Sequence, residues 1–504
     1  MRKFWRIGLI LVIGLSACGD KKAEQAKALQ QEMQDMLAKA TSSSNKMFTY
    51  GDVAVTPDGD AFAVTIDKVA VTLPEISPID LGKIGFKLTP DGDDIRKFSD
   101  LTWPQTVTIK GADGKEVKIA MALDHANGSW SKKLGQLLSA DILLKSLEAS
   151  EAAGDSKMMA SDVSYQIQTK DNGQGVFDQS GALGAKLVTI SDKDGQFSVA
   201  DLKFTSAIGG AKLAELMAAR ADWQKAGGND KPGEMLPFLA KMFTLIRSMN
   251  FDFSTGQISV ATGGAPIFTM GGFGLNFAMQ NTDQPKVNVT STLHYDALSI
   301  AQIKALIGDL GAEVLPTDFA MSVKVDDLPM AAILDAWSKT LPETKMTDEN
   351  AMMGTGMMAA GAAIQAIQQT TVKLTVSDGK LKAPGLTGSF TADINNDPKA
   401  PMGFTGVANV ELSDLDALIA KGQQYADEPT TAEIVGMLQM MRALSDHAKD
   451  ASGKTVDRLK ITMDAQGNAL VNGKSMMPPA EPPPAEQPST GTGTDSGSGT
   501  TTSP

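Results

Sequence analysis

The sequence predicts an α+β protein whose sheets are mainly antiparallel, built from hairpins, apolar on one face and packed against helices in two lobes. In the run from Phe273 to Met279, every second residue is large and apolar, and those between are small or polar. Such alternation is typical of a strand with one face covered. Many runs are separated by Asn-Gly or Asp-Gly, which readily adopt the positive φ angles of hairpin turns. At 504 residues the chain is long enough for two lobes with a core each.

Residues 1–17 predict a lipoprotein signal peptide. Basic residues precede an apolar run from Ile7 to Leu15, and Leu15-Ser16-Ala17 leads directly into Cys18, the single cysteine of the chain. A charged, an apolar and a small-residue segment in this order are typical of a secretory signal. The apolar run is shorter than a membrane-spanning helix. We therefore expect cleavage before Cys18 and lipidation of its thiol.

A lipid anchor at Cys18 would place the protein in the cell envelope, facing the periplasm. Gly19 follows at a position where aspartate would favour the inner membrane, so the sequence favours the outer membrane. The net charge of −13, without a cluster of Lys and Arg, argues against nucleic acid as a partner. With Cys18 lipidated, the mature chain is expected to form no disulfide.

Residues 18–46 are expected to form the lipidated N-terminus and a helical spacer. Small and apolar residues recur there at helical spacings of three and four: Ala26, Leu29, Met33, Met36 and Ala40. One narrow stripe of this kind predicts a helix that lies back on the folded body. The alternative is a structural scaffold, in which the stripe docks another envelope protein.

The first lobe is expected to span residues 47–250 and to consist of hairpins followed by helices. The predicted hairpin turns, including one in the second lobe, are Asp58-Gly59, Asp91-Gly92, Asp113-Gly114, Asn127-Gly128, Asn172-Gly173, Asp194-Gly195 and Asp378-Gly379. A slip in the alternation at Asp67-Lys68 predicts a β-bulge. Helices are predicted from Leu134 to Leu147, Gly210 to Trp223 and Met235 to Met249.

The second lobe is expected to span residues 251–477. Ser299 and Ser413 each follow a predicted strand and are expected to be helix N-caps. A helix is predicted from Ala432 to His447, and a last hairpin pairs residues 459–463 with residues 470–472.

Residues 478–504 are rich in Pro, Gly, Ser and Thr and are expected to form a disordered tail. Such a segment cannot bury enough apolar surface to offset the entropy lost on ordering.

Two C-terminal segments carry a resemblance to a known family. The junction Leu412-Ser413-Asp414-Leu415-Asp416-Ala417-Leu418-Ile419 and the hairpin from Ala465 to Lys474 resemble a Gram-negative family of unknown function, whose members are anchored periplasmic proteins. The family is similar to the YdgA-like and, more distantly, the AsmA-like envelope proteins. The resemblance implies an extracytoplasmic α+β fold, with an apolar concave face that handles lipid. It implies no catalytic residue.

No catalytic, cofactor or metal site is predicted from the motifs. His125, His294 and His447 are far apart in the sequence, and none has a Cys or a second His at ligand spacing. Ser129-Trp130-Ser131-Lys132 matches the Ser-x-x-Lys motif of acyl-enzymes but lacks the companion motifs, so we expect the start of a surface helix there. A serine hydrolase using Ser129 and Lys132 remains an alternative.

Methionine is unusually frequent, and four of the 27 residues lie in an uncharged stretch rich in Ala and Gly: Met352, Met353, Met357 and Met358. Thioethers bind Cu(I), which makes a copper site one interpretation of this stretch. A buried or ligand-contacting helix is the interpretation that we favour, because methionine fills pliant apolar surfaces. Membrane insertion is a third.

The sequence therefore favours a non-catalytic, lipid-anchored periplasmic protein that binds a lipid or another hydrophobic ligand. The expected partners are the membrane, through the anchor, this ligand and an envelope protein. The serine hydrolase and the structural scaffold are the alternatives.

Overall fold

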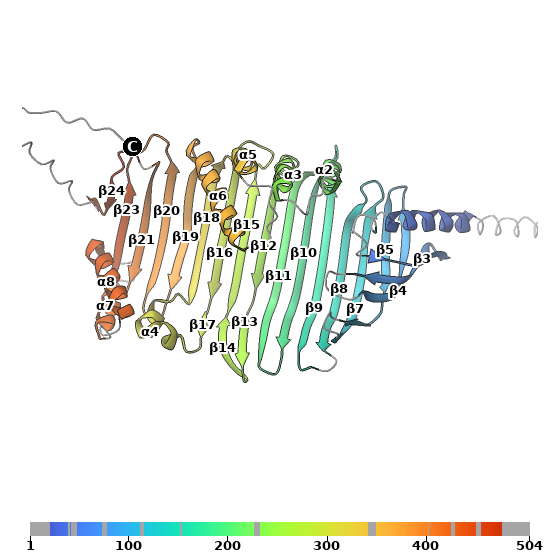
Figure 1. Ribbon diagram of the computed structural model, residues 1–504, viewed down its shortest axis with the longest axis horizontal. Helices are drawn as coiled ribbons and strands as arrows, with labels where there is room; N and C mark the ends of the chain where they lie inside the picture. The colour runs from blue at the N-terminus through green and yellow to red at the C-terminus, as the bar shows by residue number, and fades with distance from the viewer. Residues whose placement is uncertain are drawn as a thin grey trace, which may run out of the picture.

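The computed structural model describes residues 21–38, 41, 48–72, 78–110, 115–151, 154–225, 232–340, 349–401, 403–424, 429–449 and 455–475. These residues form an α+β structure dominated by one antiparallel sheet (Figure 1). Its strands are β1 (Phe48–Thr49), β2 (Val53–Asp58), β3 (Ala61–Val71), β4 (Ile79–Asp91), β5 (Ile95–Thr102), β6 (Thr106–Lys110), β7 (Glu116–Ser131), β8 (Gln136–Glu151), β9 (Lys157–Asp171), β10 (Val176–Ser191), β11 (Gly195–Lys212), β12 (Ser248–Thr255), β13 (Ile258–Thr262), β14 (Ala265–Met270), β15 (Gly272–Gln280), β16 (Val287–Asp296), β17 (Ser299–Ile300), β18 (Asp318–Leu328), β19 (Lys373–Lys382), β20 (Thr387–Asn396), β21 (Phe404–Ser413), β22 (Asp446–Lys449), β23 (Thr455–Met463), β24 (Ala469–Val471) and β25 (Lys474–Ser475). The helices are one over residues 21–38, α2 (Leu213–Lys225), α3 (Pro232–Thr244), α4 (Ile303–Val314), α5 (Met330–Thr340), α6 (Glu349–Gln368), α7 (Leu415–Gln423) and α8 (Pro429–Leu444).

The sheet is a meander in which most strands pair with their neighbours along the chain. The main ladder runs from β3 through β4, β5, β7 to β12, β15, β16, β18 to β21 and β23. Strand β12 lies at the expected boundary near residue 250 and pairs on both sides, with β11 and β15. The sheet is thus continuous there, and two separate lobes are not shown.

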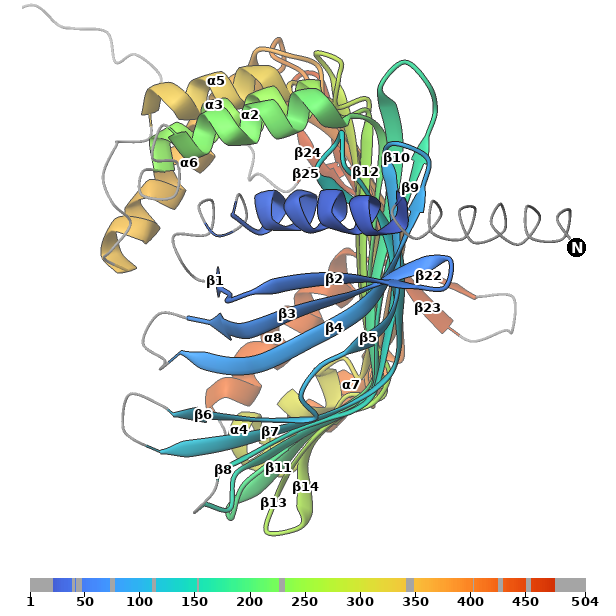
Figure 2. The same cartoon turned by 90° about the vertical axis from the view of Figure 1, so that its right-hand side faces the viewer.

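The long strands bend at residues with a left-handed backbone conformation. Asp100 of β5, Asp162 of β9 and Asp201 of β11 have φ angles of 54°, 49° and 47°. A non-glycine residue in this conformation interrupts the pleat and turns the strand. Lys68 (φ 54°) lies at a register shift between β3 and β4, which confirms the predicted bulge at Asp67-Lys68. Figure 2 shows the resulting curvature.

Helices line both ends of the strands (Figures 1 and 2). Helices α2, α3 and α5 lie along one end, where Leu213 of α2 shares a buried cluster with Met249 of β12 and Met279 of β15. Helices α4, α7 and α8 lie near the other end, where Leu310 of α4 and Leu418 of α7 are almost completely buried together. Both groups lie on the side toward which the sheet curves (Figure 2).

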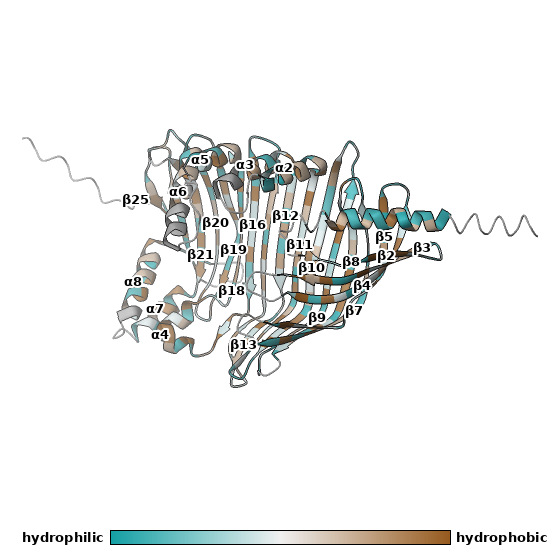
Figure 3. Cartoon of the chain, turned by 45° about the vertical axis from the view of Figure 1, so that its right-hand side comes forward, coloured by the Kyte–Doolittle hydropathy of each residue, from teal (hydrophilic) through white to brown (hydrophobic). Residues whose placement is uncertain are grey.

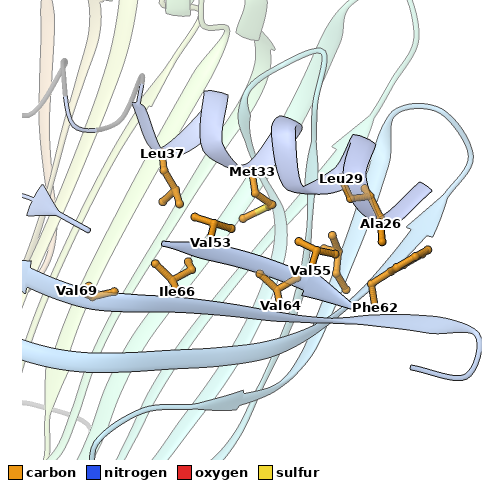
Figure 4. Packing of buried hydrophobic residues seen from close by; sticks show 11 residues of the cluster. Ala26, Leu29, Met33, Leu37, Val53, Val55, Phe62, Val64, Ile66 and Val69 are labelled. Atoms are coloured by element: carbon orange, nitrogen blue, oxygen red, sulfur yellow. The ribbon is translucent and has the colours of Figure 1, made fainter. Parts of the chain in front are cut away.

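The N-terminal helix is packed into the first part of the sheet (Figure 4). Its buried side chains are Ala26, Leu29, Met33 and Leu37, and they share one cluster with Val53, Val55, Phe62, Val64, Ile66, Val69 and Leu88. Ala26, Leu29 and Met33 of the predicted stripe are therefore occupied within the chain, whereas Met36 is exposed and Leu37 takes its place. Ala40 lies outside the described residues.

A buried ion pair also fixes this helix. Arg96 of β5, with a side chain only 7% exposed, donates from Nε to Glu32 Oε1 and from Nη2 to Glu32 Oε2, both at 3.0 Å. Such a two-point pair sets the orientation of the helix as well as its position.

The predicted helix from Leu134 to Leu147 is wrong, because this segment lies mostly in strand β8. Its apolar residues fit a helical period, but β8 pairs with β7 on one side and with β9 on the other. Tertiary pairing overrides the local preference. The helices expected at 210–223, 235–249 and 432–447 are present as α2, α3 and α8, with shifted ends.

The turns at Asn127-Gly128 and Asp378-Gly379 are also wrong, because both dipeptides lie inside strands, β7 and β19. A Cβ atom on Gly128 would come within 2.6 Å of the ring of Phe98, and one on Gly379 within 2.6 Å of that of Phe390. Glycine is needed there for close approach of a neighbouring ring. The turn at Asp113-Gly114 lies outside the described residues, and the remaining predicted turns are confirmed.

The two predicted serine N-caps are displaced by a few residues. Ser299 lies in the short strand β17, and Gln302 occupies the N-cap position of α4. Ser413 ends β21, and Asp414 occupies the N-cap position of α7. Gln302 and Asp414 both have positive φ, so the chain turns sharply between strand and helix. The last hairpin is confirmed by the pairing of β23 with β24.

Replacing Met33 tests the docking of the N-terminal helix. Met33 is 2% exposed and Met36 is 38% exposed, so the two residues form a matched pair on one helix. We expect Met33→Ala to lower the free energy of unfolding by about 2–5 kcal/mol, because it leaves a cavity. Met36→Ala should change it by less than about 0.5 kcal/mol. Urea unfolding measures both, and equal effects would contradict the packing of this helix.

Candidate functional site

One transverse row of large apolar side chains crosses the middle of the sheet. Each member is directly opposite the next on the neighbouring strand: Ile142, Tyr165, Leu183, Phe204, Phe253, Leu275, Leu293 and Met321. Directly opposed residues lie on the same face of a sheet. We call these eight residues the apolar row. Four of them are well exposed: Tyr165 by 38%, Leu183 by 48%, Phe204 by 39% and Leu275 by 41%.

The adjacent row, one residue along each strand, points to the opposite face and is polar or small. Its members are Asp141, Gln166, Ala182, Thr205, Asp252, Asn276, Thr292 and Ser322. Gln166 Nε2 donates to Asp141 Oδ1 at 3.1 Å, and Asn276 Nδ2 donates to Asp252 Oδ2 at 3.4 Å. We call these residues the polar row. Figure 3 shows hydrophilic and hydrophobic residues alternating along the same strands.

The apolar row lies on the concave side of the sheet. Phe251 and Phe277 are two residues from Phe253 and Leu275 on their strands and therefore share their face. Both pack against the buried cluster that includes Leu213 of α2. Since the sheet curves toward these helices (Figure 2), the row lies in the trough beside them.

Aromatic rings extend the concave surface on both sides of the row. Phe204 stacks on Phe251 with ring centroids 6.3 Å apart, and Phe253 contacts Phe273 edge-on at 5.9 Å. Tyr295 and Phe319, on the neighbouring strands β16 and β18, stack at 5.8 Å. Such ring pairs present large, stiff apolar area.

The polar row lies beside a separate hollow of about 810 Å³ on the opposite face. Its lining includes Asn127, Asp141, Gln166, Gln168 and Thr205, which come from four strands and share the polar face. Ser129 Oγ lies 2.7 Å from Ser139 Oγ within this lining.

Ser129 and Lys132 are engaged with different partners. Ser129 lies on strand β7, not at the start of a helix as expected. The Lys132 amine lies 3.6 Å from the carboxylate of Glu32, on the N-terminal helix, while the Ser129 hydroxyl contacts Ser139. An extended backbone does not place side chains three residues apart on one face, as a helical Ser-x-x-Lys motif requires.

The three histidines lie in different parts of the sheet. His294 of β16 lies beside Gly274 of β15, where a Cβ atom would overlap the imidazole ring. His125 of β7 contacts Asp124 and Asp141, at 3.0 and 3.3 Å. Among the described residues, no group of three or more His, Cys, Asp or Glu side chains is arranged to hold a metal ion.

His447 belongs to a charged cluster that no sequence motif indicates. Asp457 of β23 is 3% exposed, and its Oδ1 accepts a hydrogen bond from Ser445 Oγ at 2.9 Å and lies 2.6 Å from His447 Nδ1. Arg442 Nη1, on α8, lies 3.4 Å from the same oxygen. Arg442 Nε lies 2.5 Å from Asp416 Oδ1, on α7, and this hydrogen bond lowers the pKa of the Asp416 carboxyl. The cluster joins α7 and α8 to the last long strand.

The methionine-rich stretch forms most of helix α6. Met357 and Met358 are exposed, and Ala362 and Ala366 are buried. The side chains of Met352 and Met353 lie outside the described residues, as do Cys18, the signal peptide and the tail.

No family model, no curated protein and no solved structure matches this chain. Within the described ranges, no helix is both long and apolar enough to cross a membrane.

Titration of His125 tests its contacts. Hydrogen bonds to Asp124 and then to Asp141 raise the pKa of His125 above 6.5. The histidine therefore stabilises the fold below about pH 6.5, and this contribution is lost as the pH rises through the folded-state pKa. We expect Asp124→Asn to bring the pKa of His125 back toward 6.5, as measured by NMR. An unchanged pKa would contradict the assigned contact.

Proposed function

We propose that this chain is a non-catalytic, lipid-anchored periplasmic protein that binds a lipid or another hydrophobic ligand in the trough of its sheet. The observation that supports this proposal is the apolar row, whose side chains lie together on one face and four of which remain well exposed. Exposed apolar patches of soluble proteins are typical of ligand or partner sites.

The proposal includes a sheet that is apolar along its concave face and polar along its convex face. The eight strands from Ile142 to Met321 place the ends of the row about 34 Å apart, at about 4.8 Å per strand. Half of a bilayer core is about 15 Å thick, so an acyl chain that crosses one leaflet fits along the row. Each apolar side chain that a ligand covers contributes about 25 cal/mol per Å² removed from water.

The membrane partner follows from the sequence. Lipidation at Cys18 would hold the body at the membrane, with the outer membrane favoured by Gly19. The docked helix over residues 21–38 then connects the anchor directly to the sheet, because Glu32 and Met33 fix it to the body.

Substitution of Leu183 tests ligand binding. Leu183 is in the apolar row, and its neighbour Ala182 is in the polar row on the same strand, so the two form a matched pair on opposite faces. We expect Leu183→Gln to weaken binding of a fluorescent long-chain fatty acid about tenfold, or about 1.4 kcal/mol. Ala182→Gln should leave the affinity unchanged.

The same proteins, purified from membranes, should carry lipid detectable by mass spectrometry. Absence of both bound lipid and fatty-acid binding in the wild type would contradict the proposed ligand. Equal losses in the two variants would place the binding elsewhere.

Replacing Cys18 tests the anchor. We expect the wild-type protein to fractionate with the outer membrane, and Cys18→Ala to lose the lipid-linked form. Density-gradient separation of membranes measures this. A wild-type protein without lipid would contradict the lipobox, whereas recovery in the inner membrane would contradict only the sorting prediction.

A further inference from the structure

Helix α6 presents an apolar stripe that the rest of the described chain leaves exposed. The helix packs against α5 and buries Ala362 and Ala366. On the opposite side, Met357 is 73% exposed and Ile364 is 54% exposed. Figure 2 shows α6 extending away from the sheet.

The exposed positions recur at spacings of four, three and four: Met357, Gly361, Ile364 and Gln368. This spacing keeps them on one side of the helix. A Cβ atom on Gly361 would meet nothing within 4 Å, so the middle of the stripe is open between two larger side chains. We call these four residues the α6 stripe.

The composition around the stripe favours a helix over a membrane surface as its partner. No residue from Asn350 to Val372 is charged, and none is aromatic. Helices that lie in a membrane interface typically carry Lys and Arg on one face and Trp or Phe on the other. Small residues between larger apolar ones instead permit close approach of a second helix.

We propose that the α6 stripe binds the same stripe of a second copy of this chain, in an antiparallel pair. A two-fold axis near Gly361 would bring Met357 of one copy against Ile364 of the partner subunit, and the reverse, because the two lie almost symmetrically about that glycine. A two-fold contact requires a surface that is complementary to itself. The stripe carries no charge, so two chains of net charge −13 can meet there without repulsion between like charges at the contact.

One pair of helices buries less than the roughly 800 Å² per partner of a standard interface, so the contact is weak for proteins free in solution. Confinement to a membrane raises the effective concentration of the partners. In this respect the dimer depends on the proposed anchor at Cys18, and the test is made in intact cells.

The experiment is disulfide trapping of the full-length, lipidated protein. Apart from Cys18 the chain has no cysteine, so Gly361→Cys introduces the only other thiol. Helix axes about 8–10 Å apart, with Cα atoms about 2.3 Å from each axis, leave facing Cα atoms about 3.4–5.4 Å apart, which overlaps the spacing of about 4.4–6.8 Å that a disulfide spans. We expect mild oxidation to convert most of this variant to a species of twice the mass.

Gln368→Cys is the matched control, because in an antiparallel pair its two copies are separated by about 14 residues of helix rise, or about 21 Å. It should not cross-link. Adding Ile364→Asp to Gly361→Cys should reduce the dimer at least tenfold.

No cross-link at Gly361→Cys in protein that fractionates with the membrane would overturn the proposal. Equal cross-linking of both cysteine variants would overturn the antiparallel arrangement, and a product of another mass would assign the stripe to a different protein. Because fractionation is measured on the same cells, loss of the anchor is distinguished from loss of the dimer.

Discussion

The structure depends on one continuous ladder of antiparallel backbone hydrogen bonds. Most of the described residues between Val53 and Met463 belong to strands of this sheet, and the helices described in this range lie mainly near the ends of the strands. Helices at the strand ends cover the rims of the concave face and leave its centre, including Leu183 and Leu275, exposed. The centre of the concave face is thus exposed because the helices cover only a small part of the sheet.

A ladder of this kind must also end, and its two ends are closed differently. At the first end, β1 and β2 both pair with β3, and the N-terminal helix covers them through Met33 and its neighbours. At the last end, the outer edge of β23 is covered by two short strands, β22 and β24. Short pieces of this type leave little free edge for pairing with another chain. The buried carboxylate of Asp457 adds a polar link there between α8 and the edge.

The sequence predicts turns and bulges well where one or two residues determine the local backbone conformation. The bulge at Lys68 and most of the hairpin turns follow from such positions. The prediction fails where a glycine is needed for packing, as at Gly128. An Asn-Gly pair predicts a turn, but here the glycine lies inside a strand and leaves room for the ring of Phe98. The prediction also fails for strand β8, whose apolar residues fit a helical period although the strand pairs with β7 on one side and with β9 on the other.

The sequence predicts the type of candidate site, an apolar surface on a sheet, but not which residues form it. Alternation in single strands indicates that each has an apolar face, but the register between strands decides whether Tyr165, Leu183 and Phe204 meet in one row. The alternation within one strand does not contain that register, which also depends on the turns and bulges that join the strands. The same limit applies to the pairing of Glu32 with Arg96, 64 positions apart.

The bends in the long strands preserve this register. On β10 and β11, Ala185 pairs with Leu202 before the bend and Leu187 pairs with Ala200 after it, so the pairing continues without a slip past Asp201. Between β9 and β10 the pairing likewise continues past Asp162. The two aspartates lie opposite Lys186, one on each side, so neighbouring strands bend at the same level. A bulge in only one strand would shift its pairing by one residue and set polar side chains against the apolar row. Aligned bends therefore let the sheet curve into a trough while Leu183 and its neighbours stay on one face.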